Sequence, residues 1–271
     1  MFKTSASLTI QYDNPFSPFS GSERLKGFQW AAQSGFDAVE IILSDPGLID
    51  VQRLAEELSG LNLPVSTIST GQACALEKIS LTDSAGYMRA AAVDRMRANI
   101  DFSAMLGGPN VTVGLIRGKG SPENKTIERE LLKYELDKVL NHAAKKNVRI
   151  NLEPLNRYEA ALLNSCEDTL NFIHEMGDPE CLGVLYDTFH SNIEDPSPAY
   201  AAEMLGGRIS HVHIADSNRR LPTEGHIDFA AVMAALKKTD YKGYISLEVL
   251  NIPDAEHIKV SAGRCFKMIN A

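Results

Sequence analysis

Four short apolar segments of this chain each finish with a residue type that binds metal ions. Three finish with a carboxylate, at Glu153, Asp187 and Glu248, and the fourth carries an imidazole at His213. A buried strand gains nothing from a charged end unless something of opposite charge lies there, and four such ends in succession make a chance origin implausible. The pattern therefore predicts one bound divalent metal ion, and with it an enzyme.

The chain alternates eight strand-like runs with eight helix-like stretches. The expected strands are residues 7–11, 38–43, 64–70, 110–116, 149–155, 182–187, 209–215 and 243–249. The expected helices are residues 22–34, 51–59, 84–106, 126–146, 167–176, 198–205, 229–237 and 255–269. The strands are too apolar to have a solvated face, which favours a closed parallel barrel over an open sheet. We expect an α/β fold, a (β/α)8 TIM barrel, as a single domain over residues 1–271.

In such a barrel the chemistry lies at the carboxyl ends of the strands, where the four candidate ligands fall on consecutive strands. Any one of them alone is as well explained by a helix cap or a salt bridge. Together they are not, because burying several like charges without a cation is costly. His211 and His213 share one face of their strand, and we choose His213 as the ligand because it lies nearer the strand's end. Three roles stay open for His211: it fills the barrel interior, it donates a hydrogen bond to a metal ligand, or it takes a direct part in the site.

Three carboxylates and one imidazole form a hard, oxygen-rich ligand set. It favours Mn²⁺, with Mg²⁺ or Co²⁺ as alternatives, and leaves positions open for substrate oxygens. A metal bound by a carbonyl and an adjacent hydroxyl acidifies the carbon between them and stabilises a cis-enediolate. Glu153 and Glu248 are the two Glu residues of the set, so they are the candidate acid and base.

The sequence around these residues resembles a known family. The runs LEPLNR at 152–157, DTFH at 187–190 and HIADSNR at 213–219 look like signatures of ketose 3-epimerases of the D-tagatose and D-psicose type. These enzymes are part of the xylose-isomerase-like TIM barrel superfamily of sugar isomerases and epimerases. The runs TGQ at 70–72, SLTD at 80–83 and GLIRG at 114–118 are similar to a branch that acts on keto-sugar acids.

The resemblance implies a carbohydrate epimerase that inverts C3 of a ketose or keto-sugar acid. It implies metal ligands and a proton-transfer pair at the positions chosen above, and it implies that Glu159, His190 and Arg219 hold the C1 to C3 end of the sugar. A loop cap at Glu159 and a salt bridge at Arg219 are the simpler alternatives. Relatives of this type also suggest a homodimer or homotetramer. Where many of them have Gly, this chain has Thr223, so the shape of that loop is in question.

Two further groups of residues remain open. Arg117 and Lys119 follow the fourth expected strand, where they would hold a substrate carboxylate or form a solvated basic turn. Tyr12, Phe16 and Phe19 follow the first strand and would either wall the far end of a sugar or close the barrel. Arg117 is included among the candidate substrate contacts.

Composition excludes several partners. The net charge of −8 argues against nucleic acid, which is bound through Lys and Arg. No apolar run is long enough to cross a membrane, and the start lacks the apolar core of a signal peptide, so we expect a cytoplasmic location. The partner expected is a small sugar or sugar acid. No nucleotide-binding glycine motif follows a strand, so no nucleotide cofactor is expected.

Other activities share the barrel. A hydroxypyruvate isomerase or an inosose dehydratase would use the same metal and carboxylates. A metal-dependent apurinic endonuclease would need several zinc ions, many His and a basic surface, whereas this chain has seven His and is acidic. A sugar-binding protein without catalysis would have no use for the paired carboxylates.

Overall fold

The computed structural model describes residues 1–269, in which eight parallel strands close into a barrel in chain order, with the first strand paired to the last. The predicted (β/α)8 fold is therefore confirmed. The strands are β1 (Lys3–Thr9), β2 (Ala38–Ile42), β3 (Val65–Ser69), β4 (Asn110–Val113), β5 (Ile150–Leu152), β6 (Leu182–Asp187), β7 (Ile209–Ile214) and β8 (Tyr244–Leu247).

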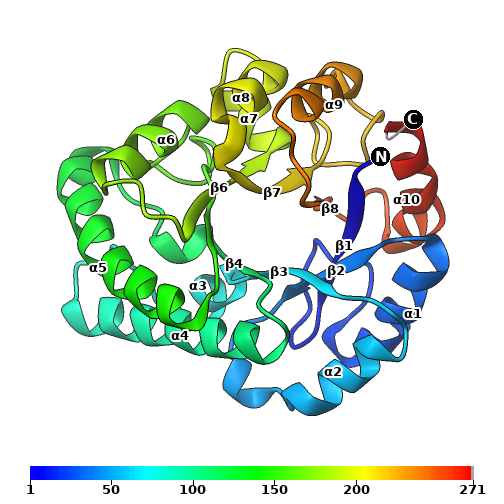
Figure 1. Cartoon of the computed structure of the whole chain (residues 1–271), viewed down its shortest axis with the longest axis horizontal. Coiled ribbons are helices and arrows are strands. Elements are labelled where there is room, and N and C mark those ends of the chain that lie inside the picture. Colours follow the sequence, from blue (N-terminus) through cyan, green and yellow to red (C-terminus); the bar gives the residue numbers. More distant parts are fainter. Residues whose placement is uncertain (270–271) are drawn as a thin grey trace.

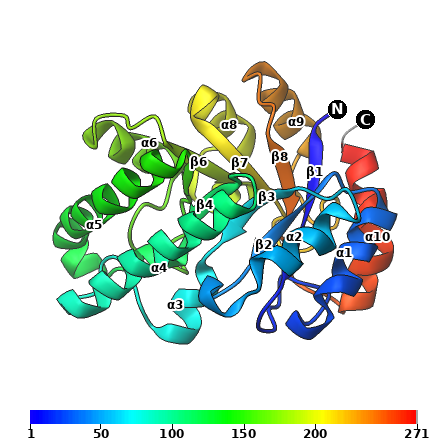
Figure 2. The same ribbon diagram turned by 60° about the horizontal axis from the view of Figure 1, so that its bottom comes forward.

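Helices form an outer ring around the strands, as Figures 1 and 2 show, and the short helices α3 and α7 lie at the carboxyl ends of β3 and β6. They are α1 (Arg24–Ser34), α2 (Val51–Ser59), α3 (Gly71–Glu77), α4 (Gly86–Met105), α5 (Lys125–Lys146), α6 (Cys166–Glu175), α7 (Thr188–Glu194), α8 (Pro198–Leu205), α9 (Phe229–Lys238) and α10 (Ala255–Ile269). Several begin at a capping residue: the side chains of Asp50, Ser165 and Asp228 each accept a hydrogen bond from a backbone N–H in the first turn. No helix within residues 1–269 combines the length and apolar character that crossing a membrane requires.

Strands β4 and β5 end three residues earlier than predicted, at Val113 and Leu152, and three elements differ more strongly from the sequence expectation. Strand β1 begins at Lys3 and ends at Thr9, whereas residues 7–11 were predicted. The short helices α3 and α7, which follow β3 and β6 directly, were not predicted. Both are seven residues long, too short to show a helical period, and both lie at the carboxyl ends of strands.

The first strand was misplaced because its buried positions alternate between apolar and polar side chains. Ala6 and Leu8 belong to the hydrophobic core, while Ser5 and Ser7, which alternate with them along the strand, are buried polar residues. Polar packing also links later strands, since Asn151 Nδ2 donates to the Thr67 hydroxyl at 3.2 Å and lies 3.3 Å from that of Thr112. A strand with small hydroxyl side chains on one buried face does not stand out by hydropathy.

Candidate metal centre and active site

The four predicted ligands converge at the carboxyl ends of β5 to β8. Glu153 and Glu248 directly follow β5 and β8, Asp187 is the last residue of β6, and His213 lies near the end of β7. One potential ligand atom from each lies within 4.8 Å of the others. Parallel strands in register bring their ends to one rim, so residues 95 positions apart in sequence (153 to 248) become neighbours.

The donor set fits a divalent cation. His213 Nδ1 lies 3.3 Å from Glu248 Oε2 and 3.5 Å from Glu153 Oε1. This nitrogen is buried and has no hydrogen-bond partner among the described residues. An imidazole nitrogen left without a partner amid three carboxylates is the arrangement that a metal ion would satisfy. Hard oxygen ligands with one imidazole suit Mn²⁺ or Mg²⁺. A structural zinc site, by contrast, is usually closed by thiolate ligands.

Because these charged groups lie so close together, their pKa values are shifted. Burial, reinforced by the charges of Glu248 and Asp187, raises the pKa of the Glu153 carboxyl to about 7. Burial alone would lower the pKa of His213, but the Glu248 and Glu40 carboxylates outweigh it and raise that pKa well above its ordinary value. Without a metal, the cluster therefore retains protons at neutral pH, and a bound cation would replace them.

Arg219 closes one side of the cluster. Its Nη1 donates to Asp187 Oδ2 at 2.6 Å and its Nη2 donates to Glu248 Oε2 at 2.8 Å. Burial alone would lower the pKa of Arg219, but these two carboxylates raise it above its usual range. The guanidinium also lies over the rings of Phe189, at 4.4 Å, and Phe16, at 5.2 Å. Arg219 is thus held by two carboxylates and two aromatic rings. It forms the salt bridges that were the simpler alternative for this residue, and it also lines the cavity.

His190, on α7, is held as a neutral imidazole. Its Nδ1 accepts hydrogen bonds from the Asn156 backbone N–H at 3.2 Å and from Asn156 Nδ2 at 2.8 Å. Burial lowers the pKa of His190 to about 3, so the ring carries a single proton, on Nε2. Asn156 Nδ2 also donates to Glu159 Oε1 at 2.9 Å, which fixes an otherwise exposed side chain.

A cavity of about 290 Å³ opens above the cluster. The end of the cavity nearest the predicted ligands is lined by Glu153, Glu159, His190, Arg219 and Glu248. Its opposite wall comes from the β1 to β4 side of the barrel. It consists of the loop after β1 (Asp13, Asn14, Pro15 and Phe16), the strand residues Ile42, Ser69 and Thr112, helix α3 (Gly71, Gln72, Ala75 and Leu76), and Gly114 and Leu115 after β4. A space of this size accepts a small, compact ligand.

Comparison with known proteins agrees with this geometry. Residues 28–265 match the family described as "Xylose isomerase-like TIM barrel". The chain belongs to this family. An L-ribulose 3-epimerase of Methylomonas sp. is 33% identical over 85% of the chain and 79% of its own length. A 3-dehydro-D-guloside 4-epimerase of Escherichia coli is 27% identical over 83% of the chain and 86% of its own length.

Solved structures of xylose isomerase-like barrels superpose closely on this one. A D-allulose 3-epimerase from Methylomonas sp., in complex with D-allulose, has a TM-score of 0.77 and 28% identity over 98% of this chain and 90% of that chain. The xylose isomerase-like TIM barrel family predicted from the sequence motifs is confirmed by the family match.

Arg117 does not reach the cavity, and the prediction that it contacts substrate is corrected. It is fully buried, and its guanidinium donates to the backbone carbonyls of Glu153, Leu162 and Leu163. Burial lowers the pKa of Arg117 to about 10, which still leaves it charged at neutral pH. The 3-10 turn Leu115–Arg117 (η3) directs this side chain inward, and Lys119 beyond it is exposed and outside the cavity wall. Arg117 thus fastens the end of β5 to the loop that follows.

The aromatic group after β1 divides between two roles. Phe16 lines the cavity, whereas Phe19 packs on Trp30 with ring centroids 5.7 Å apart. Tyr12 is 45% exposed. One of the three residues therefore faces the ligand space, and another closes the outer layer.

Two residues at the centre were missed by sequence reasoning. Glu40, in β2, is fully buried and lies within hydrogen-bond distance of His213 and His211. A lone Glu inside the apolar run Ala38–Ile42 was the available signal. Gly114 leaves room for Glu153, because a Cβ at this position would collide with Glu153 Oε2.

Thr223, where relatives were expected to have Gly, adopts a left-handed φ of 81° and donates its N–H to Asp216 Oδ2 at 2.8 Å.

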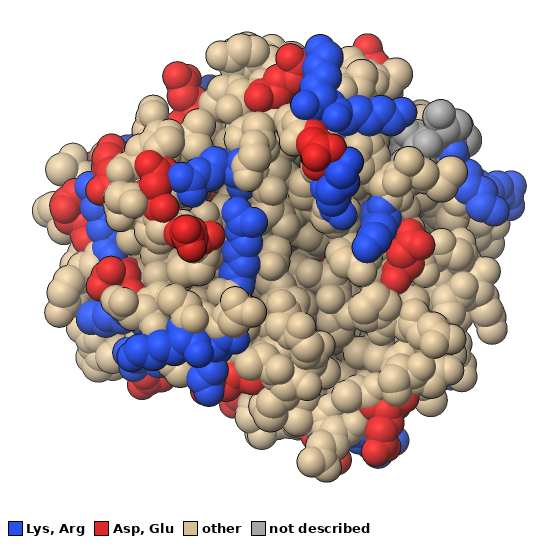
Figure 3. All heavy atoms as spheres, viewed as in Figure 1, with Lys and Arg blue, Asp and Glu red and all other residues tan. Residues whose placement is uncertain are grey.

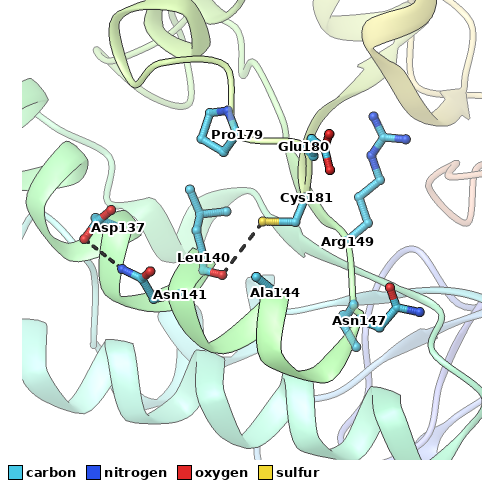
Figure 4. Close-up of a pocket in the computed structure, with 10 residues that line it drawn as sticks. Asp137, Leu140, Asn141, Ala144, Asn147, Arg149, Pro179, Glu180 and Cys181 are labelled. Carbon is cyan, nitrogen blue, oxygen red and sulfur yellow. Dashed lines mark hydrogen bonds between the residues drawn. The ribbon is translucent and has the colours of Figure 1, made fainter.

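A second cavity, of about 620 Å³, lies at the opposite end of the strands between α5 and the start of β6. Figure 4 shows Asp137 paired with Asn141, and the Cys181 thiol directed at the Leu140 carbonyl. Arg149 and Glu180 also line it, without converging on a common centre. The larger hollow therefore lacks the converging acid, base and ligand groups of the smaller one.

Proposed function

We propose that this protein is a metal-dependent sugar epimerase that inverts C3 of a neutral ketose. The observation that carries the proposal is the convergence of Glu153, Asp187, His213 and Glu248 at one end of a sugar-sized cavity. When bound there, a divalent ion, with Mn²⁺ as first choice, would supply Lewis acidity toward a carbonyl and an adjacent hydroxyl oxygen. The relationship to L-ribulose and ketose 3-epimerases supports the same reaction.

The proton-transfer step is assigned to Glu153 and Glu248. Both line the cavity, and they come from strands β5 and β8, which lie on either side of β6 and β7. One carboxylate takes the proton from C3, and the other, as a carboxylic acid, returns one to the opposite face.

His190 and Arg219 are assigned to the oxygens nearest the reacting carbon. The proton on His190 Nε2 is available to a substrate oxygen, because Nδ1 already accepts from Asn156. Arg219 Nη2 directs an N–H at that same Nε2 over 3.3 Å, so the guanidinium and the imidazole adjoin one position in the cavity, and a substrate oxygen there would take up both donors. Fixed donors aimed at an oxygen that gains negative charge are the usual way to stabilise such a transition state. Glu159, held by Asn156, would accept from a substrate hydroxyl.

The cavity favours a neutral ketose over a keto-sugar acid. Arg219 is the one cation among the described residues that line it, and two carboxylates already pair with it. Asp13 and Glu159 add negative charge to the wall. A substrate carboxylate placed there would be desolvated without a partner, which is costly. The buried position of Arg117 removes the cation on which the keto-acid alternative depended.

Proton NMR in D₂O, with protein, Mn²⁺ and a panel of ketoses and keto-sugar acids, tests the proposal. We expect deuterium to enter at C3 of a neutral ketose as its C3 epimer forms. Exchange at C1 with an aldose product would indicate an isomerase instead, and loss of water would indicate a dehydratase. Inversion at C4 of a 3-keto sugar would assign this chain the reaction named for its Escherichia coli relative.

We also propose a homodimer or homotetramer, on the family resemblance alone. Figure 3 shows Lys and Arg interspersed with Asp and Glu over the visible face. Light scattering of the purified protein would measure the assembly directly.

A further inference from the structure

Glu40 lies deep in the barrel, beneath the proposed metal centre. It comes from the middle of β2, on the other side of β8 and β1 from β7, yet its carboxylate contacts two imidazoles of β7. Glu40 Oε2 lies 2.9 Å and Oε1 lies 3.1 Å from His213 Nε2, and Oε2 lies 3.3 Å from His211 Nε2. A buried carboxylate needs hydrogen-bond donors, and here two imidazole rings face the fully buried Glu40 carboxylate at hydrogen-bond distance.

The two nitrogens of His213 therefore face different partners. Nε2 points down to Glu40, while Nδ1 points up to Glu153 and Glu248 and has no hydrogen bond among the described residues. Because a carboxylate only accepts, Nε2 must carry a proton. In the neutral ring, that leaves the Nδ1 lone pair directed at the centre of the ligand cluster.

His211 completes the network on the other side. Its Nε2 is 2.8 Å from the Ser246 hydroxyl, two residues before Glu248 on β8, and its ring meets that of His213 edge to face at 5.3 Å. Glu40 thus connects β2 with the two strands that carry His213 and Glu248. The arrangement limits rotation of both imidazole rings.

We propose that Glu40 is the positioning residue of the metal centre: it fixes the His213 tautomer and ring orientation so that Nδ1 is the metal ligand. This inference rests on the proposed function. Glu40 does not line the cavity, so it acts through His213 and not on the sugar. Carboxylates behind a histidine ligand raise its basicity, and their loss typically weakens metal binding by about 10- to 100-fold.

The test compares Mn²⁺ binding to the full-length wild type, Glu40→Gln and Glu135→Gln, measured by electron paramagnetic resonance of the free ion. Glu135 is a matched control, since it is a buried Glu on α5 that pairs with Arg89 and Lys138 away from the centre. We expect Glu40→Gln to raise the Kd by 10- to 100-fold, and Glu135→Gln to leave it within twofold. At saturating Mn²⁺ the kcat of Glu40→Gln should recover, whereas its Mn²⁺ activation constant should not.

An unchanged Kd for Glu40→Gln would overturn the inference, and so would equal weakening in both variants. Glu40, His211 and His213 could themselves be ligands, since their atoms lie within 4.8 Å of one another. A stoichiometry of two ions per wild-type chain, falling to one in Glu40→Gln, would therefore overturn it as well. If the wild type bound no divalent ion, the metal-dependent function would fail, and this inference with it.

A measurement on the wild type alone covers the case in which Glu40→Gln does not fold. Long-range ¹H–¹⁵N correlation spectra of the Mg²⁺-loaded protein, labelled at histidine, report which ring nitrogen carries the proton. We expect His213 to be protonated at Nε2. A proton on Nδ1 would overturn the inference.

Discussion

Arg219 Nη2 donates to Glu248 Oε2 over 2.8 Å, so the carboxylate proposed to move the substrate proton is held by a buried cation. The other arm of the same guanidinium holds Asp187 at 2.6 Å. A planar fork can hold two carboxylates and still face the cavity, which a lysine ammonium cannot reproduce. The contact therefore sets the position of one proton-transfer residue and one proposed metal ligand together.

Arg219→Lys should reduce kcat/KM by about 10- to 100-fold, because it keeps the charge but loses the two-armed geometry. Arg220→Lys, at the next position, is the control and should stay near the wild-type rate. Steady-state kinetics on the best ketose measures both variants. A wild-type rate for Arg219→Lys would show that charge alone suffices at this position.

Removing the metal should abolish turnover and lower the melting temperature. A ligand that binds only the folded state stabilises it by about 2.7 kcal/mol when present at 100 times its Kd. Activity and thermal unfolding, each measured before chelation, after it and after Mn²⁺ is restored, test this. Full activity in the chelated protein would rule out the metal requirement.

Glu153→Gln and Glu248→Gln should each lower kcat by about 10² to 10⁴-fold, since the amide cannot exchange a proton with C3. Deuterium uptake at C3 should slow with it. Glu56→Gln, on the exposed face of α2, is the control. Near-normal turnover in either variant would exclude that residue as acid or base.

Metal affinity should rise with pH across the neutral range. The pKa of Glu153 is raised from 4.5 to about 7, so between these values the metal-free folded protein holds a proton that the unfolded chain has released. Its stability therefore falls as pH rises through this window, and the raised pKa of His213 extends the fall to higher pH. Metal displaces both protons, so the Mn²⁺ Kd should be at least about tenfold weaker at pH 6 than at pH 8. Equilibrium dialysis measures the Mn²⁺ Kd at the two pH values. Equal Kd values would contradict the prediction.

Arg117→Met should destabilise the fold by about 3 kcal/mol, because it leaves the carbonyls of Glu153, Leu162 and Leu163 without their buried donor. Chemical denaturation measures the loss. The ratio of activities on neutral and acidic sugars should not change. A selective loss on keto-sugar acids would restore the substrate contact that the structure argues against.

The features that could be predicted from the sequence are those whose pattern recurs several times along the chain. The strand and helix alternation, and the metal-ligand types at the ends of β5 to β8, recur often enough to be found without coordinates. Glu40 was not assigned a role and Arg117 was assigned to the substrate, because each is a single charged residue whose role depends on partners far away in sequence. Whether Arg117 points toward the cavity or into the protein is decided by the turn at Leu115–Arg117, which has no periodic signature.

The split of the cavity between two halves of the barrel has an evolutionary consequence. The proposed acid and base and the candidate ligands come from the ends of β5 to β8, whereas the opposite wall comes from the ends of β2 to β4 and from the segments that follow β1, β3 and β4. Helix α3, with Gln72 and Leu76, can be exchanged without moving a proposed reacting group, whereas the Phe16 ring packs on Arg219 and has to be kept. A duplicated gene could thus acquire a different sugar by changing one side of its barrel, and grafting such segments between relatives is the corresponding route for directed evolution.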